Sequence, residues 1–341
     1  MHGALHRRAR IGLQSCARAT PRLSALVFGV LLASSGSAPA IAQAWPEKPV
    51  RLVVAFSPGG LIDTFARTLQ PRLAEGLGQP VVIENRGGAG GTLAEAMVAK
   101  SAPDGYTVLV SADSPPANPH LFRNLGYDVF RDLAPVSMLA RVPFALVVHP
   151  SVPAASIAEF IAAARSHAGQ YSYASPGTGT GNHLYMELFK ALAGVEITHV
   201  PYKGGGPAMN DLIGGQVQAS LISVTLAAPQ VRAGKARALG TTGEKRTAML
   251  PQVPTFVEAG FGDFTPHTWS GLFLPAGTPA AILQRLHAES AKALRAPEVR
   301  TRFGELGAEI VMNSPAEFAA LLRAENERLG KLIRERRISA D

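Results

Sequence analysis

A short turn at residues 57–63, Ser-Pro-Gly-Gly-Leu-Ile-Asp, carries the first residues of this 341-residue chain that could bind a ligand. Gly59 and Gly60 permit backbone conformations and close approaches that other residues disfavour. A continuous apolar stretch precedes the turn and predicts a buried strand, and apolar residues at helical spacing follow it. A helix that begins here aims unpaired N–H groups and the positive end of its dipole at one point. The turn is expected to hold an anion, or to be an ordinary turn capped by Ser57 or Asp63.

A second turn at residues 175–181, Ser-Pro-Gly-Thr-Gly-Thr-Gly, resembles the first. Its glycines free the backbone N–H groups, and Ser175, Thr178 and Thr180 add hydroxyl donors. The turn does not fit the dinucleotide pattern G-x-G-x-x-G, because Asn182 stands where the last glycine belongs, and it lacks the lysine of a P-loop. It is predicted to bind an anion, with a flexible connecting loop as the alternative.

Sequence patterns typical of enzymes are missing or weak. The chain has no G-x-S-x-G elbow and no H-E-x-x-H motif, and its histidines are scattered without metal-ligand spacing. His183, beside the second turn, is the histidine expected to lie near a ligand. We therefore expect a binding protein without cofactor, metal or catalytic residues. The enzymatic alternative is a periplasmic hydrolase that uses His183 with a nearby hydroxyl.

Residues 1–44 have the features of a secretory signal peptide. They contain five arginines and no acidic residue, then a short apolar run, and then small residues that offer cleavage near Ala42 or Ala44. Cys16, the only cysteine, lies in this leader, which argues against disulfides and thiol chemistry in the mature protein. Without the leader, 28 basic residues face 25 acidic ones, a net charge of +3 that does not support nucleic-acid binding. A soluble periplasmic protein is expected.

Strand-length apolar runs alternate with helical patterns along the mature chain, which predicts an α/β protein with mostly parallel sheets. After residue 274 the pattern becomes helical to the end, with Ser314 as an N-cap before Pro315. Segments at residues 141–144 and 265–269 look like crossings between two domains. We expect domain 1 to comprise residues 45–142 plus 270–341 and domain 2 residues 143–269. Two crossings form a hinge that can close on a ligand.

Taken together, several motifs resemble those of the Bug family, the substrate-binding proteins of tripartite tricarboxylate transporters. The motifs are Phe56-x-Pro58-Gly59-Gly60-x-x-Asp63, Val81-Val82-Ile83-Glu84-Asn85-Arg86-x-Gly88-Ala89-Gly90-Gly91, Pro103-Asp104-Gly105-Tyr106-Thr107, His199-Val200-Pro201-Tyr202-Lys203-Gly204 and Pro275-Ala276-Gly277-Thr278-Pro279. The resemblance covers essentially the whole mature chain. It implies a type II periplasmic binding protein of two α/β domains, a Venus flytrap that is monomeric and delivers a small carboxylate to membrane permease subunits. A sensor module that signals to a histidine kinase is a further alternative.

The resemblance also implies a ligand site made by the two turns and by two strand ends. One ligand carboxylate is expected at the turns, partly through ordered waters, with Gly59 and Gly60 binding through N–H groups and Asp63 shaping the turn or holding a water. The expected ligand-binding residues are Phe56, Ser57, Gly59, Gly60, Leu61, Asp63, Ser111, Ser114, Ser175, Thr178, Gly179, Thr180, His183 and Ser223. Ile222 and Ser223 stand where several members carry an acid, which favours a simple organic acid over an amino acid.

Overall fold

The computed structural model describes residues 45–340. The expected signal peptide, its cleavage sites and Cys16 lie outside the described residues. Residues 45–341 form one compact unit by their contacts. In the described part of the chain, no helix combines the length and the apolar character needed to cross a membrane.

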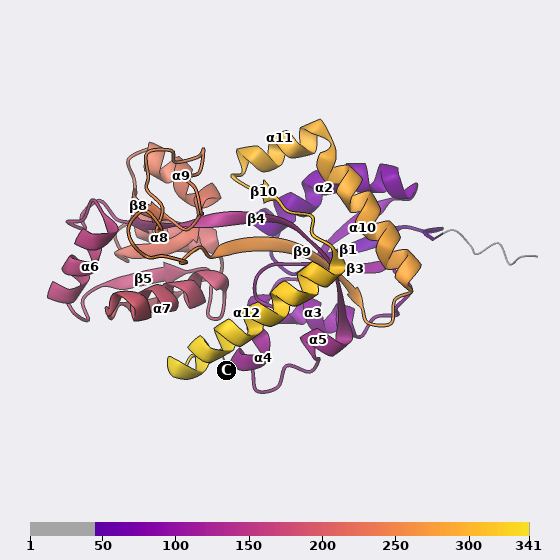
Figure 1. The fold of residues 1–341 in the computed structure, drawn as a ribbon, viewed down its shortest axis with the longest axis horizontal. Coiled ribbons are helices and arrows are strands. Elements are labelled where there is room, and N and C mark those ends of the chain that lie inside the picture. Colours follow the sequence, from indigo (N-terminus) through magenta and orange to yellow (C-terminus); the bar gives the residue numbers. More distant parts are fainter. Residues whose placement is uncertain (1–44, 341) are drawn as a thin grey trace, which may run out of the picture. The chain divides into compact units, whose positions relative to one another are not determined.

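The first half of the molecule is built on a sheet in which β1 (Val50–Val54) lies between β2 (Val81–Asn85) and β3 (Thr107–Ser111), all parallel (Figure 1). Alternate residues of β1 pack on opposite faces. Leu52 and Val54 join the core against α2 (Leu61–Leu77), whereas Val53 joins the core against α3 (Thr92–Ala99). All three side chains are fully buried. The prediction of a strand covered on both faces is confirmed.

The strand β4 (Leu133–Val148) connects this sheet to a second one. Its first part pairs antiparallel with β9 (His267–Pro275), which also pairs with β3, and with the short β10 (Glu309–Ile310). Its last five residues pair with β7 (Ala219–Ser223) on one side, and its last four pair with β8 (Arg237–Thr241) on the other. The second sheet continues through β5 (Ser172–Ser175) to β6 (Thr198–Pro201). The two segments expected to cross between domains are therefore paired strands, with Val142 opposite Thr268.

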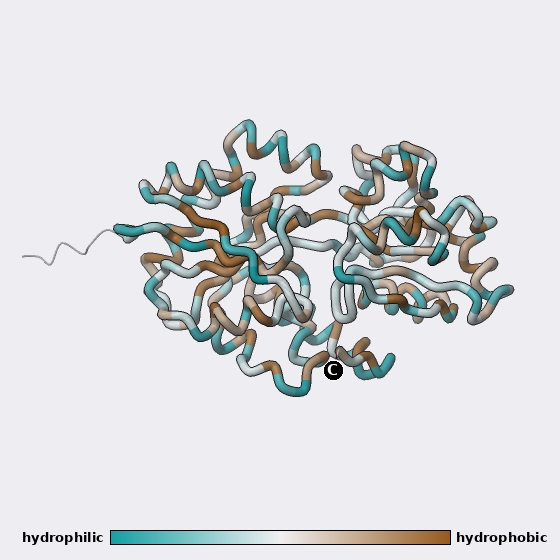
Figure 2. The backbone as a smooth tube through the Cα atoms, turned by 180° about the vertical axis from the view of Figure 1, so that it is seen from behind, coloured by the Kyte–Doolittle hydropathy of each residue, from teal (hydrophilic) through white to brown (hydrophobic). Residues whose placement is uncertain are grey.

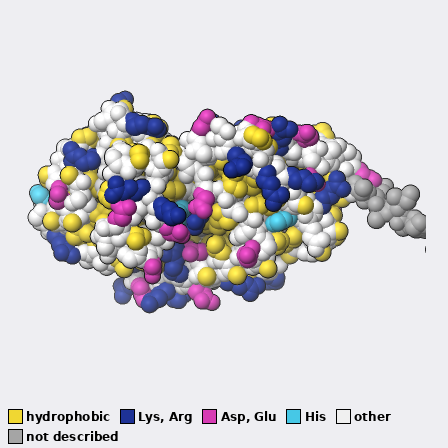
Figure 3. All heavy atoms as spheres, turned by 45° about the horizontal axis from the view of Figure 1, so that its top comes forward, with side chains coloured by type: hydrophobic (Ala, Val, Ile, Leu, Met, Phe, Trp, Pro, Cys, Tyr) yellow, Lys and Arg dark blue, Asp and Glu magenta, His cyan; other side chains and the backbone are white. Residues whose placement is uncertain are grey.

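The remaining helices follow the strands in sequence and cover the two sheets (Figure 1). They are α4 (Asn118–Leu121), α5 (Val129–Asp132), α6 (Ile157–Ser166), α7 (Gly181–Ala193), α8 (Gly205–Ile213), α9 (Val224–Arg232), α10 (Ala280–Arg295), α11 (Pro297–Glu305) and α12 (Pro315–Glu335), with a 3₁₀ turn at Ala89–Gly91. Figure 2 shows hydrophobic residues concentrated along strands of the first sheet, whereas along the helices they alternate with hydrophilic residues. Figure 3 shows the surface hollowed into a notch between the part that carries α9 and the part that carries α11.

The C-terminal helix α12 packs against both cores. Ser314 is its N-cap, as the Ser-Pro sequence predicts, and it also forms a capping box with Glu317. Near its start, Phe318 packs against β9 in the core of the first sheet, and near its end Leu329 and Ile333 join the core of the second. The domain ranges expected from the sequence stay a prediction, because this helix contributes to the two cores alike.

Several elements differ from the expectation. The strand expected at residues 144–149 begins much earlier, at Leu133, because the segment 133–143 pairs with β9 through two register irregularities. The chain after residue 274 is not helical to its end, because β10 lies between α11 and α12. A two-residue strand is too short to leave a periodic pattern.

The packing of α12 predicts a large cost for Phe318→Ala. The Phe318 ring is fully buried, with its centroid 5.4 Å from that of Trp269 and 5.2 Å from that of Phe273. Truncation should lower the free energy of unfolding by about 3–5 kcal/mol, measured by chemical denaturation. Leu192→Ala, at a side chain that is 58% exposed on α7, should change it by less than about 0.5 kcal/mol. Equal effects would contradict this description of α12.

Candidate functional site

The first turn is held by Asp63, which lies in the first turn of α2 and is almost fully buried. Its Oδ2 accepts hydrogen bonds from the Gly59 N–H and from Arg67 Nε, both at 2.8 Å, and its Oδ1 accepts from Asn85 Nδ2 at 2.8 Å. Burial alone would raise the pKa of Asp63, but these hydrogen bonds outweigh it and hold the pKa below its usual value. Asp63 is thus an ionised brace, and the Gly59 N–H is already used.

The N–H groups that remain for a ligand are those at the start of α2. The first helical hydrogen bond runs from the Thr64 N–H to the Gly60 carbonyl at 2.9 Å. The N–H groups of Leu61, Ile62 and Asp63 precede it, so the helix itself supplies them no acceptor. Gly60 is exposed, and its backbone stands at the helix N-cap. This end of α2 has the geometry of an anion site.

The second turn repeats the hydrogen bonds of the first, with His183 in the role of Asp63. The Gly179 N–H donates to His183 Nδ1 at 3.1 Å, as the Gly59 N–H donates to Asp63. Gly179 has φ +79° where Gly59 has φ +78°, a region that favours glycine. The first bond of α7 runs from the Leu184 N–H to the Thr180 carbonyl at 3.0 Å. The two turns are therefore equivalent structures on the two sheets.

His183 lies beneath the second turn and braces it. It is 5% exposed and stacks on His199, with the ring centroids 3.8 Å apart. Burial and the neighbouring His199 lower the pKa of His183 to about 3, so the ring is neutral and its Nδ1 is free to accept. The hydrolase alternative expected a hydroxyl beside His183. In the described residues, the hydroxyl of Ser175 instead bonds to His199 Nε2 at 2.7 Å.

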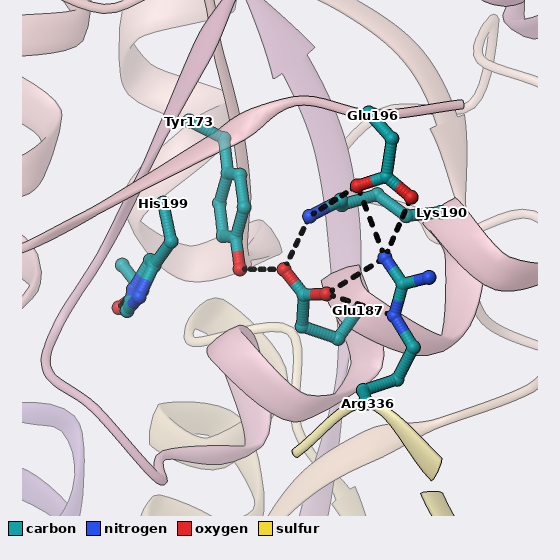
Figure 4. Close-up of polar contacts among 7 residues, drawn as sticks. Tyr173, Glu187, Lys190, Glu196, His199 and Arg336 are labelled. Atoms are coloured by element: carbon teal, nitrogen blue, oxygen red, sulfur yellow. Dashed lines mark hydrogen bonds and ion pairs between the residues drawn. The ribbon is translucent and has the colours of Figure 1, made fainter. Parts of the chain in front are cut away.

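Near the stacked histidines, a cluster of charged groups holds Arg336, which follows α12, against α7. The Tyr173 hydroxyl and Lys190 Nζ both donate to Glu187 Oε1, at 2.8 and 2.7 Å (Figure 4). Arg336, just after α12, contacts Glu187 Oε2 at 3.3 Å and Glu196 Oε1 at 3.1 Å. Burial would raise the pKa of Glu187, but Lys190 and Tyr173 lower it below its usual value. This cluster supports the helix that carries the second turn.

The structure sorts the expected ligand-binding residues by their exposure. The exposed ones are Ser57, Gly59 and Gly60; the partly buried ones are Phe56, Leu61, Thr178 and Thr180; the buried ones are Asp63, Ser111, Ser114, Ser175, Gly179, His183 and Ser223. The exposed and partly buried residues are Phe56, which precedes the first turn, and members of the two turns. The role of all fourteen residues as ligand contacts stays a prediction.

Ser111 and Ser114 surround a buried acid that the sequence did not single out. Ser111 Oγ donates to Glu95 Oε1 at 2.9 Å and Ser114 Oγ contacts the same oxygen at 3.5 Å, while Asn118 and Tyr127 donate to Oε2. Glu95 is fully buried, and burial raises its pKa despite these donors. These hydroxyls therefore organise the segment after β3. Ser223 lies at the start of α9, opposite Phe144 of β4.

Asp113 is a second buried acid. It lies in the segment 111–114 that the family resemblance implies is near the ligand, but sequence reasoning did not single it out. It follows β3, is 7% exposed, and lies against Gly181, the first residue of α7. Burial raises the pKa of Asp113 to about 7, although the Gly181 N–H and the Thr268 side chain partly oppose the shift. One sequence signal could have identified Asp113: it lies just after a predicted strand. Parallel strands end at the same edge of a sheet, and the first turn follows the neighbouring strand β1.

This pKa predicts how Asp113 changes stability with pH. Its folded pKa lies above the ordinary 3.8, so its contribution to stability is fully present below pH 3.8 and is lost as the pH rises to about 7. Asp113→Asn removes the titration. The stability difference between variant and wild type should shift in favour of the variant by on the order of 1–4 kcal/mol between pH 4 and pH 8, measured by denaturation. A pH-independent difference would contradict the burial of an ionisable Asp113.

Comparison with known proteins confirms the resemblance to the Bug family. Residues 65–338 match the model of the tripartite tricarboxylate transporter family receptor. BugT of Bordetella pertussis is 36% identical over 312 residues, 91% of this chain and 96% of BugT. A Rhodopseudomonas palustris structure with adipate has 37% identity and a TM-score of 0.80, over 86% of this chain and 99% of that one. The structure of MatC from the same organism with bound malate has 36% identity and a TM-score of 0.78, over 85% of this chain and 100% of MatC. The chain therefore belongs to the receptor family of tripartite tricarboxylate transporters and has its two-domain periplasmic binding protein fold.

Proposed function

We propose that this protein captures a small organic acid between its two turns in the periplasm and delivers it to the membrane permease of a tripartite tricarboxylate transporter. The supporting observation is the equivalence of the two turns, each of which presents the N-terminus of a long helix, α2 or α7, at the end of a buried strand. Related structures with adipate and with malate support a carboxylate as the ligand. Export through the predicted signal peptide of residues 1–44 completes this proposal.

Backbone and hydroxyl donors are sufficient for this task. Neither turn contains a lysine or an arginine, and the Arg67 side chain next to the first turn is bound to Asp63. Micromolar binding requires about 8 kcal/mol, and hydrogen bonds to a charged group contribute about 1.5–3 kcal/mol each. A few N–H groups from each helix start supply this energy. Because these donors recognise a carboxylate and not the rest of the molecule, the remainder of the ligand determines which acid is preferred.

A thermal-shift screen of mono-, di- and tricarboxylates on ligand-stripped protein should find at least one stabilising acid. Gly60→Val should weaken binding of that acid about tenfold or more, because it covers the start of α2. Gly60 has φ −73°, and a Cβ there would come no closer than 3.4 Å to the Ser57 carbonyl, so the valine is compatible with the fold. Thr180→Val should have a similar effect at the second turn.

Two control variants separate binding from general damage. Gly304→Val places the same side chain on α11 at an exposed position where a Cβ meets no atom within 4 Å, and Thr198→Val changes an exposed residue of β6. Both controls should leave binding unchanged. The proposal fails if no carboxylate stabilises the protein, or if Gly60→Val and Thr180→Val bind as the controls do. Native mass spectrometry of the purified protein should identify a co-purifying acid directly.

A further inference from the structure

Asp113 places a second carboxyl group at the N-terminus of α7, where the proposed ligand carboxylate would bind. A Cβ built on Gly181 would lie 2.2 Å from Asp113 Oδ2 and 2.8 Å from its Cγ, so only glycine leaves room for the carboxyl group. Oδ2 is buried and accepts no hydrogen bond of normal geometry within the described residues, although the Gly181 N–H and the Thr268 side chain lie close enough to the carboxyl group to lower its pKa in part. A buried polar atom without a partner is costly, so this oxygen calls for a hydrogen-bond partner that the described residues do not provide.

The segment that carries Asp113 joins the two halves of the molecule at the second turn. Asp113 follows β3 of the first sheet, and α7, which it contacts, follows β5 of the second. Eight residues further on, Leu121 lies against the second turn itself, since a Cβ on Gly179 would come within 2.7 Å of its Cδ1. A carboxylate bound to the N–H groups at the start of α7 is therefore a neighbour of the Asp113 carboxyl group.

Two carboxylates that share one helix N-terminus cannot both be ionised at low cost, because like charges at this distance repel and burial strengthens the repulsion. We propose that Asp113 is a ligand contact that carries a proton: in the loaded protein its Oδ2–H donates to the ligand carboxylate, and binding of one carboxylate takes up one proton. The proton supplies the missing donor at Oδ2 and removes the repulsion. This inference rests on the proposed function, since it requires a carboxylate at the second turn.

The other groups around Asp113 do not supply this proton near neutral pH. Glu325 of α12 faces it but already bonds to Arg328 at 2.7 Å and to the Tyr185 hydroxyl at 2.9 Å. Burial lowers the pKa of His183 on α7 to about 3 and that of His267, next to Thr268 on β9, to about 4. Glu325 and Tyr185 interact electrostatically with Asp113, and the other titratable or charged groups in its surroundings include Glu95, His183, His267 and Arg328. Burial of Asp113, by contrast, raises its pKa to about 7.

Isothermal titration calorimetry with malate and adipate tests the proposal. Titrations at pH 8 in phosphate and in Tris, whose ionisation enthalpies differ, give the number of protons taken up on binding. The wild type should take up close to one proton, and its affinity should fall by up to tenfold per pH unit above pH 7. Asp113→Asn keeps the shape and offers an amide donor, so it should bind with no proton uptake and with an affinity independent of pH.

Two further variants complete the experiment. Asp113→Ala removes the donor and should bind at least tenfold more weakly than Asp113→Asn, also without proton uptake. Asp263→Asn changes an exposed acid and should behave as the wild type does. Binding by the wild type without proton uptake, or equal uptake by Asp113→Asn, overturns the role of Asp113 and leaves the proposed function intact. Failure of both acids to bind overturns the present proposal together with the proposed function for these acids.

Discussion

A helix starts with backbone N–H groups that have no acceptor within the helix, and this constraint organises the candidate site of the protein. At two places a buried strand runs through a glycine turn into such a helix. Each turn uses one side chain in the first helical turn, Asp63 or His183, to accept a hydrogen bond from a glycine N–H. The N–H groups of the first helical residues have no acceptor within the helix. An acidic brace and a neutral brace thus build the same backbone geometry, because either side chain accepts a hydrogen bond.

The buried acids illustrate how surroundings determine the state of a carboxyl group. Glu187 has Lys190 and Arg336 as neighbours, and its pKa lies below the usual value. Glu95 has only neutral donors, which compensate burial in part, and its pKa is raised. Asp113 has a buried oxygen that finds no hydrogen-bond partner among residues 45–340, and burial raises its pKa to about 7. Glu187 is therefore suited to hold the structure together, whereas burial allows Asp113 to keep a proton up to near neutral pH.

The two halves are held together by paired strands and by one helix. The long strand β4 pairs with β9 along the crossing, so the hinge expected there consists of hydrogen-bonded backbone. Helix α12 contributes Phe318 to one core and Ile333 to the other, and Arg336 then reaches α7. A hydrogen bond also joins the segments on either side of the notch: the hydroxyl of Thr225, on α9, donates to the carbonyl of Leu306, just after α11. Any closing motion must therefore involve α12 as well as the two strands.

The sequence by itself determined the features that depend on neighbours in the chain. The continuous apolar run before residue 57 was sufficient to predict a strand buried on both faces, and the glycines that follow were sufficient to predict the two turns, since both effects are local. The N-cap at Ser314 was likewise readable, because the N–H group that it accepts from, that of Glu317, lies three residues away. The family resemblance followed from these same turn motifs, and their order along the chain supported the fold.

Only the tertiary structure decided which polar groups meet. Ser111 and Ser114 stay predicted ligand contacts, and only the structure shows that they also contact Glu95, which comes from another element. The first half of β4 became a strand because β9, more than 100 residues later, offers it hydrogen bonds. Asp113 is a candidate ligand contact only because packing places it against Gly181 at the start of α7. These contacts depend on how far-separated segments pack and on the burial that results, and no local pattern in the chain encodes either one.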